Sequence, residues 1–498
     1  MAVELVAKIR LLGRQLLTPG ESLARRVVHA GFWAFALRIV ERLFGFARTV
    51  VLARLLSPKD FGLFGIAMLA LSALETFSQT GFEAALIQKK DDVKPYLNTA
   101  WTVQILRGLV LAGILAASAP FVAGFFGEPK AAMLLRVLAL GELAKGFTNI
   151  GVVFFRKELE FHKQFIYMLT GTLADFAVAI LAALLLRNAW ALAYGLLAGN
   201  VVRMVVSYLV CPYHPRLQLE VNKARELHSF GRWIFASSIL VFLLNHGDDV
   251  LVGKLLGTVA LGLYQMAYAI SNLPATEITH VVSQVTFPTY SKLQDSFLKL
   301  RRGYLQTFYS VAVVSLPLAG AIVVFARDFT LLFLGKQWLE MIPALQVLTI
   351  WGVIRSLGAM TAPLWQAVGK PYLSTVFQLA KLVLLCALIY PLTQRWGILG
   401  TAVAVTTESV LVHVVGYVAM AKTLNCRVRV LVLPLVRPTL ATGVMLLAAL
   451  GLSRTVGTDS FAGLLAVGLV TGIFYLAAFM LLGRLMPAED FLGQVPSD

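Results

Sequence analysis

Residues 51–67 read VLARLLSPKDFGLFGIA, and residues 251–267 read LVGKLLGTVALGLYQMA. The two stretches share their pattern of leucine, glycine and basic positions at an offset of 200 residues. The correspondence continues along both halves, with small drifts in offset, through Phe126–Gly127 and Leu334–Gly335, Val137–Leu138 and Val347–Leu348, and Lys145 and Arg355. An internal repeat of this length predicts that the chain folds as two copies of one unit.

The composition places most of the chain in lipid. Of the 498 residues, 58% are hydrophobic and 14% are charged, whereas soluble domains carry about 25% charged residues. A membrane-spanning helix needs roughly 20 apolar residues, and about fourteen such segments follow one another along the sequence. We therefore expect an all-α integral membrane protein, and the repeat makes a pseudo-symmetric transporter the first hypothesis.

Turn signals such as Ser57-Pro58 and Gly369-Lys370-Pro371 separate many of the expected spans. The spans are expected at residues 31–54, 61–87, 97–119, 131–153, 165–187, 190–211, 232–256, 260–287, 304–326, 341–367, 372–394, 397–421, 430–453 and 461–483. An even number of spans separates the two copies, so both should enter the membrane in the same direction, related by a pseudo-twofold axis along its normal. The expected organisation is an N-terminal six-helix lobe at 29–211, a cytoplasmic linker at 212–231, a C-terminal six-helix lobe at 232–421, two additional spans within 422–485 and a cytoplasmic tail at 486–498.

The net charge of +17 would raise the question of nucleic acid in a soluble protein. Here the lysines and arginines alternate between loops: one side of the membrane holds clusters such as Lys89, Lys90 and Lys94, and the other holds scattered cations. This bias predicts a multi-pass protein of the cytoplasmic (inner) membrane with both termini in the cytoplasm and no nucleic-acid partner. Residues 1–28 combine an apolar helical face with basic residues, which favours a helix lying on an anionic leaflet; a disordered basic tail is the alternative.

Enzymatic function finds little support in the sequence. No expected loop exceeds roughly twenty residues, which leaves no room for a catalytic domain outside the membrane. No G-x-x-x-x-G-K-[ST] motif for ATP occurs, and no Ser-His-Asp, H-E-x-x-H or paired-cysteine arrangement stands out. The three cysteines are far apart and predict neither a disulfide framework nor a metal site. We expect a protein that is not an enzyme.

Ionisable residues inside spans are costly and therefore mark candidate functional positions. The first span carries Arg38, Glu41, Arg42 and Arg48 at three- and four-residue intervals, so these side chains share one helical face. That face should line a watery cavity or a polar interface, and its three arginines suit an anionic substrate. The alternative is a structural pairing of Glu41 with Arg38 or Arg42, although this would leave a net positive stripe.

The seventh span, which repeats the first, carries Asn245, Asp248 and Asp249 on one face. In the repeat, Arg48 and Thr49 align with Asp248 and Asp249, so one lobe offers cations where the other offers carboxylates. We expect these carboxylates to pair with first-span arginines in one conformation and to release them to the substrate in another. A static ion pair between the lobes is the structural alternative.

Further ionisable residues within spans complete the candidate set. They are Glu75, Glu83, Arg107, Glu142, Lys145, Asp175, Arg203, Glu277, His280, Arg355, Lys381, Glu408 and His413. Lys145 and Arg355 are the more informative because the repeat keeps a cation at matched positions in both lobes. We assign substrate binding to Arg38, Arg42, Arg48, Lys145, Arg355 and Lys381, and coupling or gating to Glu41, Asp175, Asn245, Asp248 and Asp249; no metal site is expected.

The run ARLLSPKDFGLFGIAMLALSALETFSQTGFEAALIQKKD at 53–91 resembles the polysaccharide transporter family. These are Wzx-type flippases of the multidrug/oligosaccharidyl-lipid/polysaccharide (MOP) exporter superfamily, and the pattern is most similar to the branch of colanic acid and teichuronic acid exporters. The resemblance covers about residues 30–420. It implies a MOP/MATE-like fold with a central cavity open alternately to each side. It also implies a polyprenyl-pyrophosphate-linked oligosaccharide as substrate, no cofactor, and a monomer working beside polymerase and export machinery, with coupling to H⁺ or Na⁺ left open.

Three other functions compete with this interpretation. A multidrug cation exporter of the same superfamily would need a lumen dominated by acidic residues, and the stripe of Arg38, Arg42 and Arg48 argues against it. A lipid II-type flippase would differ in the glycan that it moves. A membrane glycosyltransferase or polymerase would need a large catalytic loop or a nucleotide-sugar motif.

The orientation can be tested by cysteine substitution at Lys59, Lys130 and Lys336, each in a variant that lacks the native cysteines. Because these positions fall in loops on the cation-poor side, a membrane-impermeant maleimide should label all three in intact cells. Labelling that appears only after permeabilisation would show that the orientation is reversed.

Overall fold

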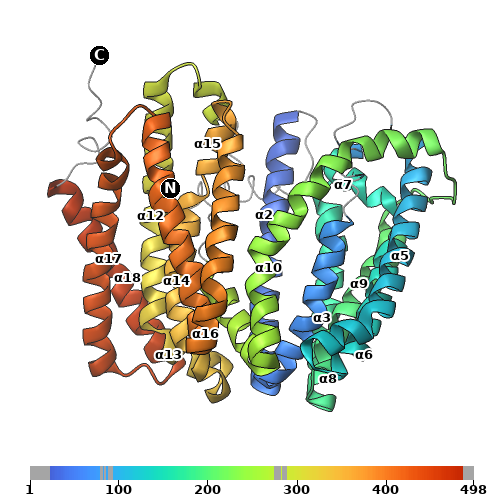
Figure 1. The fold of residues 1–498 in the computed structure, drawn as a ribbon, viewed down its shortest axis with the longest axis horizontal. Coiled ribbons are helices and arrows are strands. Elements are labelled where there is room, and N and C mark those ends of the chain that lie inside the picture. The colour runs from blue at the N-terminus through green and yellow to red at the C-terminus, as the bar shows by residue number, and fades with distance from the viewer. Residues whose placement is uncertain are drawn as a thin grey trace, which may run out of the picture. The chain divides into compact units, whose positions relative to one another are not determined.

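The computed structural model describes residues 23–78, 82, 86–87, 93–273, 282, 286 and 289–485, and these residues contain helices and turns but no strand (Figure 1). The all-α fold class is therefore confirmed. The chain divides into two compact units, residues 1–242 and 243–498. The predicted tail at 486–498 and most of the segment at 1–28 lie outside the described residues.

Unit 1 is a bundle of packed helices. Its elements are α2 (Leu23–Leu55), α3 (Pro58–Phe77), α5 (Lys94–Phe126), α6 (Lys130–Gly146), the 3₁₀ turn η1 (Ile150–Val152), α7 (Val153–Lys157), α8 (Phe161–Leu186), α9 (Trp190–Val210) and the first part of α10 (Val221–Ser271). Helix α2 packs on α8, α8 on α9, and α9 on α6, which also contacts α5 and α3. One buried core joins Leu52 and Leu56 of α2 to Ala179 and Ala183 of α8.

Unit 2 contains the rest of α10 and the helices that follow it. They are α12 (Phe297–Val324), α13 (Ala326–Phe329), the π turn η2 (Thr330–Leu334), η3 (Lys336–Met341), α14 (Ile342–Gly358), α15 (Thr361–Ala367), α16 (Tyr372–Thr423), α17 (Val428–Val456) and α18 (Phe461–Leu485). Helix α12 contacts α14 and α17, α14 contacts α16, and α17 packs on α18. The main core surrounds Tyr304, Phe308, Leu364 and Trp365.

Among the described residues, ten helices are long and apolar enough to cross a membrane, or eleven if the bent pair of α6 with η1 and α7 is one span. Helix α2 is not among them because charged residues are spread along it. Helices α10 and α16 each contain a break, at Gly257 (φ 83°) and Gly397 (φ 59°), so each holds two of the predicted spans. Every predicted span thus coincides with a helical segment, although parts of 61–87 and 260–287 lie outside the described residues.

The S-P-K-D segment of the quoted motif forms the start of α3. The Ser57 hydroxyl accepts a hydrogen bond from the Asp60 backbone N–H, and the Asp60 carboxylate accepts one from the Ser57 backbone N–H, which together make a capping box. The second Asp60 oxygen accepts a hydrogen bond from the Ala189 N–H at 3.0 Å. One carboxylate therefore caps α3 and ties it to the turn between α8 and α9.

The second copy of the repeat makes the corresponding turn differently. Gly257 replaces the capping serine and adopts φ 83° and ψ −175°, a backbone conformation that residues with a Cβ rarely adopt. The two copies therefore keep the position of the turn while one relies on a side-chain cap and the other on the freedom of glycine.

Replacement of Asp60 by Ala should lower the free energy of unfolding by about 1–2 kcal/mol, because it removes the cap and the bond to Ala189. Lys59→Ala in the same turn is the matched control, since the Lys59 side chain is 58% exposed and its ion pair with Glu128 is long, at 3.9 Å. Thermal unfolding of the purified variants in detergent measures both. Equal melting temperatures for the two variants would contradict the role of Asp60.

Candidate functional site

Unit 1 contains a cavity of about 580 Å³ between α3, α5, α6, η1, α7 and α8. Its volume lies in the range of small-molecule binding sites. The cavity wall is mixed: apolar side chains such as Phe82, Ile87 and Leu111 alternate with polar ones. The polar lining residues are Glu75, Gln104, Arg107, Glu142, Lys145, Thr148, Arg156 and Tyr167.

The cavity forms where the fourth span is broken. Helix α6 ends at Gly146, and the chain continues through η1 and α7 with a bend of 70°. The Gln104 amide of α5 lies 3.2, 3.2 and 2.9 Å from the carbonyl oxygens of Lys145, Gly146 and Thr148, at the last residues of α6 and just beyond its end. Irregular backbone inside a membrane is tolerated where it is buried in protein or lines a cavity, and both conditions hold here.

Two glycines allow α5 and α6 to approach closely beside the cavity. A Cβ added to Gly108 would lie 2.7 Å from the Gly146 Cα, so any side chain there would push the helices apart. The close crossing places Gln104 and Arg107, one turn of α5, against the end of α6 and its Lys145.

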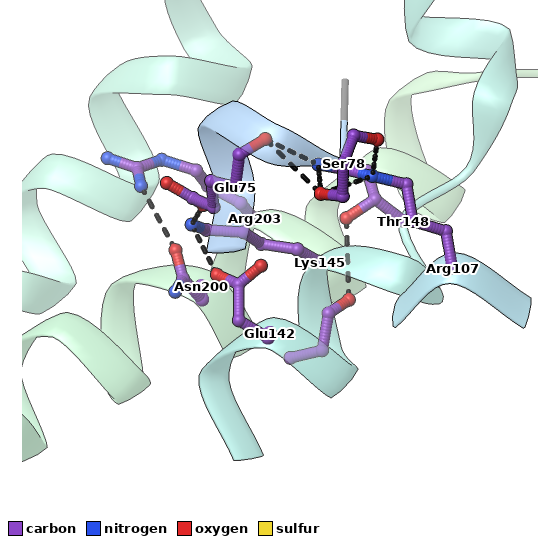
Figure 2. A network of polar contacts seen from close by, with 9 residues as sticks. Glu75, Ser78, Arg107, Glu142, Lys145, Thr148, Asn200 and Arg203 are labelled. Carbon is purple, nitrogen blue, oxygen red and sulfur yellow. Dashed lines mark hydrogen bonds and ion pairs between the residues drawn. The ribbon is translucent and has the colours of Figure 1, made fainter. Parts of the chain in front are cut away.

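At the centre of the site one lysine lies between two glutamates (Figure 2). The Lys145 Nζ lies 2.6 Å from Glu75 Oε1 of α3 and 2.6 Å from Glu142 Oε1 of α6. It donates a well-aligned hydrogen bond to Glu75, whereas Glu142 Oε1, although close, accepts none that is well aligned. The Glu142 side chain is only 4% exposed, while the lysine and Glu75 side chains are 41% and 37% exposed.

Arg107 adds a second cation, held by neutral partners (Figure 2). Its Nε donates to the Ser78 carbonyl at 2.9 Å, and its Nη2 donates to the Ser78 hydroxyl at 2.8 Å and to the Glu75 carbonyl at 3.4 Å. These contacts fix the guanidinium at the end of α3 without cancelling its charge.

The predicted stripe on the first span lies on α2, which packs on α8. Arg48 forms an ion pair with Asp175 of α8 at 3.0 Å, so two of the predicted site residues are brought together. The positive charges of Arg203 on α9 and of Arg42 attract the carboxylate of Glu41. Arg38 is half-buried and Arg42 is exposed. A polar interface between α2, α8 and α9 thus accounts for part of the stripe, and its substrate role stays a prediction.

In unit 2 the predicted carboxylates have partners within their own unit. Asp248 is 4% exposed and accepts a hydrogen bond of 2.7 Å from the Tyr264 hydroxyl. The Asp249 carboxylate lies 3.7 Å from His246 Nδ1. Asn245, one turn earlier, is half-buried. The predicted pairing of these acids with first-span arginines stays a prediction.

The cations of unit 2 differ in environment from Lys145. Arg355 donates a hydrogen bond to the Tyr268 hydroxyl at 3.3 Å and lies over the Trp351 ring at 5.2 Å. Lys381 lines a separate cavity of about 130 Å³ beside Trp365 and Tyr417. The matched cations of the repeat are therefore held by carboxylates in one copy and by aromatic side chains in the other.

Sequence reasoning selected Lys145 but left Glu75, Arg107 and Glu142 among the general candidates. It did not identify Gln104, Ser78, Thr148 or Arg156. An uncharged amide or hydroxyl gives little signal in a span, and Arg156 falls in the loop between the expected spans 131–153 and 165–187. The Gly108 and Gly146 pair and the Asn149 turn could have indicated the helix break, since the Asn149 side chain accepts from the Gly151 N–H at the start of η1.

The fold is shared with solved structures of membrane transporters. The lipid II flippase MurJ in its inward closed conformation aligns with a TM-score of 0.71 at 14% identity, over 91% of this chain and 99% of that one. An inward-facing MATE family transporter of the MOP superfamily aligns with a TM-score of 0.61 at 18% identity, over 77% of this chain and 94% of that one. The predicted MOP-type fold is confirmed.

Residues 51–343 match the family described as polysaccharide biosynthesis protein, and the chain belongs to that family. It is 24% identical over 407 residues to the lipopolysaccharide biosynthesis protein WzxC of Escherichia coli (strain K12), covering 80% of this chain and 82% of WzxC. It is 26% identical over 384 residues to the teichuronic acid biosynthesis protein TuaB of Bacillus subtilis (strain 168), covering 77% and 79%. The predicted resemblance to Wzx-type transporters is confirmed, and the protein is a multi-pass membrane transporter.

The three-residue ion cluster can be tested by a double-mutant cycle. Lys145→Gln leaves the buried Glu142 carboxylate without its cation and should cost about 1–3 kcal/mol, below the 3–5 kcal/mol of a fully buried pair because Lys145 is partly exposed. Adding Glu142→Gln should restore most of this loss. Unfolding in detergent measures each variant, and strictly additive effects of the two substitutions would contradict the coupling.

Proposed function

We propose that this transporter is a flippase for polyprenyl-pyrophosphate-linked oligosaccharide repeat units, working in the cytoplasmic membrane by alternating access during cell-surface polysaccharide biosynthesis. Family membership supports the process, and so do the names of the relatives WzxC and TuaB, which place both proteins in polysaccharide biosynthesis. The substrate and its chemistry are argued below from the site.

The observation that carries the proposal is the charged cavity of unit 1. Lys145, Arg107 and Arg156 line it together with Glu75 and Glu142. An ionised pyrophosphate cannot cross hydrocarbon unaided, because desolvating its charges costs tens of kcal/mol. Lysine and arginine recognise phosphate oxygens through charge-assisted hydrogen bonds. A cavity of this kind gives an anionic head group a polar environment inside the membrane.

The lipid part of the substrate requires no cavity. Each CH₂ of a polyprenyl chain favours the bilayer by about 0.8 kcal/mol, so the tail stays in lipid while the head group enters the protein. The arginine stripe of Arg38, Arg42 and Arg48 on α2 is proposed to offer further contacts to pyrophosphate or acidic sugars. Glu41, Asp175, Asn245, Asp248 and Asp249 are proposed to serve coupling or gating, with H⁺ or Na⁺ as the coupled ion and no other cofactor.

A multidrug cation exporter is the second candidate. Two observations favour it: the structural similarity to a MATE family transporter, and the carboxylates of Glu75 and Glu142 in the cavity. Against it, the charged side chains on the wall comprise three cations and two acids, and Lys145 already contacts both acids. A lipid II-type flippase is the alternative whose substrate is most similar to the proposed one, because it would move the same pyrophosphate head group with a different glycan.

Flipping can be measured in proteoliposomes that contain a fluorescent polyprenyl-pyrophosphate oligosaccharide, with an impermeant quencher to count the outer-leaflet molecules. The wild-type protein should equilibrate the lipid between leaflets, and Lys145→Gln should slow this at least tenfold by removing a proposed phosphate contact. Arg136→Gln is the matched control, because Arg136 lies on the same helix and is exposed outside the cavity.

The alternatives give distinct results in the same vesicles. A fluorescent organic cation should stay where it was loaded. Transport of that cation, together with no flipping of the lipid by the wild-type protein, would reject the proposal in favour of an exporter.

A further inference from the structure

The ion cluster of unit 1 has more negative than positive groups. One ammonium, on Lys145, serves two carboxylates, on Glu75 and Glu142, at 2.6 Å from each. With all three groups ionised the cluster carries one net negative charge beside a cavity in the membrane. The buried member is Glu142, whose Oε1 accepts no well-aligned hydrogen bond even from the lysine.

The surrounding charges are fixed by contacts of their own. Arg107 of α5 donates to the carbonyls of Glu75 and Ser78 and to the Ser78 hydroxyl. Arg203 of α9 contacts the side chains of Asn200 and Thr172 at 3.5 Å. Besides the members of the cluster on α3 and α6, the titratable and charged groups of the same cavity are Arg107 from α5, Arg156 from α7 and Tyr167 from α8. Arg203 from α9 lies beside the cluster (Figure 2).

Lys145 is the member of the cluster that an anion would engage. It lines the cavity, its side chain is 41% exposed, and its ammonium has three donors on a flexible stem. Any phosphate oxygen that takes a donor from Lys145 competes with the two glutamates for the same charge. An anion that binds the Lys145 ammonium therefore has a second effect. It weakens the electrostatic stabilisation that the ammonium gives to the two neighbouring carboxylates.

We infer that the Glu75, Glu142 and Lys145 cluster binds an anionic head group and a proton together, with the proton taken up by one of the two glutamates when the anion engages Lys145. This rests on the proposed function for the identity of the anion, and it names a further bound species and the residues that hold it. The proton comes from water, forms an O–H bond on a carboxylate oxygen, and is returned when the anion leaves.

The sign of the pH dependence follows from this linkage. A complex that holds more protons than the free protein is favoured as the pH falls, so anion affinity should rise toward lower pH. For one linked proton the association constant changes by at most about tenfold per pH unit. Two glutamines in place of the glutamates would remove the proton site and also free Lys145, so such a variant should bind the anion more tightly at neutral pH and without this added pH dependence.

The test uses inorganic pyrophosphate as the probe and the full-length protein in detergent. Isothermal titration calorimetry in buffers of different ionisation enthalpy counts the protons taken up on binding. Wild-type protein should take up close to one proton more per pyrophosphate than the Glu75→Gln/Glu142→Gln variant, which corrects for protons that pyrophosphate itself exchanges. If the double variant fails to fold, Glu75→Gln and Glu142→Gln are tested singly, and at least one of them should lower the proton count; an unchanged count in both would overturn the proton linkage.

The outcomes are separable. An equal proton count in wild type and variant, with binding intact, would overturn the proton linkage and leave the flippase proposal standing. Sodium-dependent binding with no proton uptake would overturn it in favour of a metal cation between the carboxylates. Binding that survives Lys145→Gln unchanged would remove the cluster from anion recognition, while the flipping assay would decide the transport function independently.

Discussion

A charged or polar group inside hydrocarbon must find a partner, and the structure of the first unit depends on how this constraint is met. The break in the fourth span interrupts the helical hydrogen bonding at the end of α6, and the Gln104 amide contacts three carbonyl groups there. That amide can reach them because Gly108 and Gly146 bring α5 and α6 together. The break in turn places Lys145 at the end of α6, beside the cavity. The same helix crossing therefore provides partners for the backbone carbonyl groups and sets the position of Lys145 in the site.

The same constraint explains why the two copies of the repeat differ at matched positions. Lys145 aligns with Arg355, but Glu142 aligns with Gly352, three residues earlier in both copies. A Cβ at Gly352 would lie 2.6 Å from the Ser271 carbonyl oxygen, so the second copy exchanges the carboxylate for close helix packing. Arg355 then engages the Tyr268 hydroxyl and the Trp351 ring. The two copies therefore share a cation at this position and differ in the partners that hold it.

The helices could be predicted from sequence because membrane spans obey a simple rule of length and polarity. The turns at Gly257 and Gly397, which the structure shows as breaks within α10 and α16, fell within or beside the gaps between predicted spans. The candidate site was predicted only in part. Intramembrane charge indicated Lys145, Arg48 and Asp175 one by one, but the contacts that join Lys145 to Glu75, or Arg48 to Asp175, cross 70 and 127 residues of sequence. Such pairs follow from helix packing, which periodicity alone does not specify.

The partners of each cation also determine how it can act on an anionic substrate. Arg48 is matched by a single carboxylate, so at a distance the Arg48 and Asp175 pair exerts little net attraction. Arg107 is held by carbonyl and hydroxyl groups, which orient the guanidinium while leaving its charge available to the cavity. Lys145 lies between these cases, because its two carboxylates hold it strongly when ionised and weakly when one of them is protonated. Under the proposed proton linkage, an arginine of constant charge lies beside a lysine whose two carboxylate partners can lose part of their negative charge. Such a pair would attract an anion in either protonation state and retain it in only one, and a carrier that must both bind and release its cargo needs that difference.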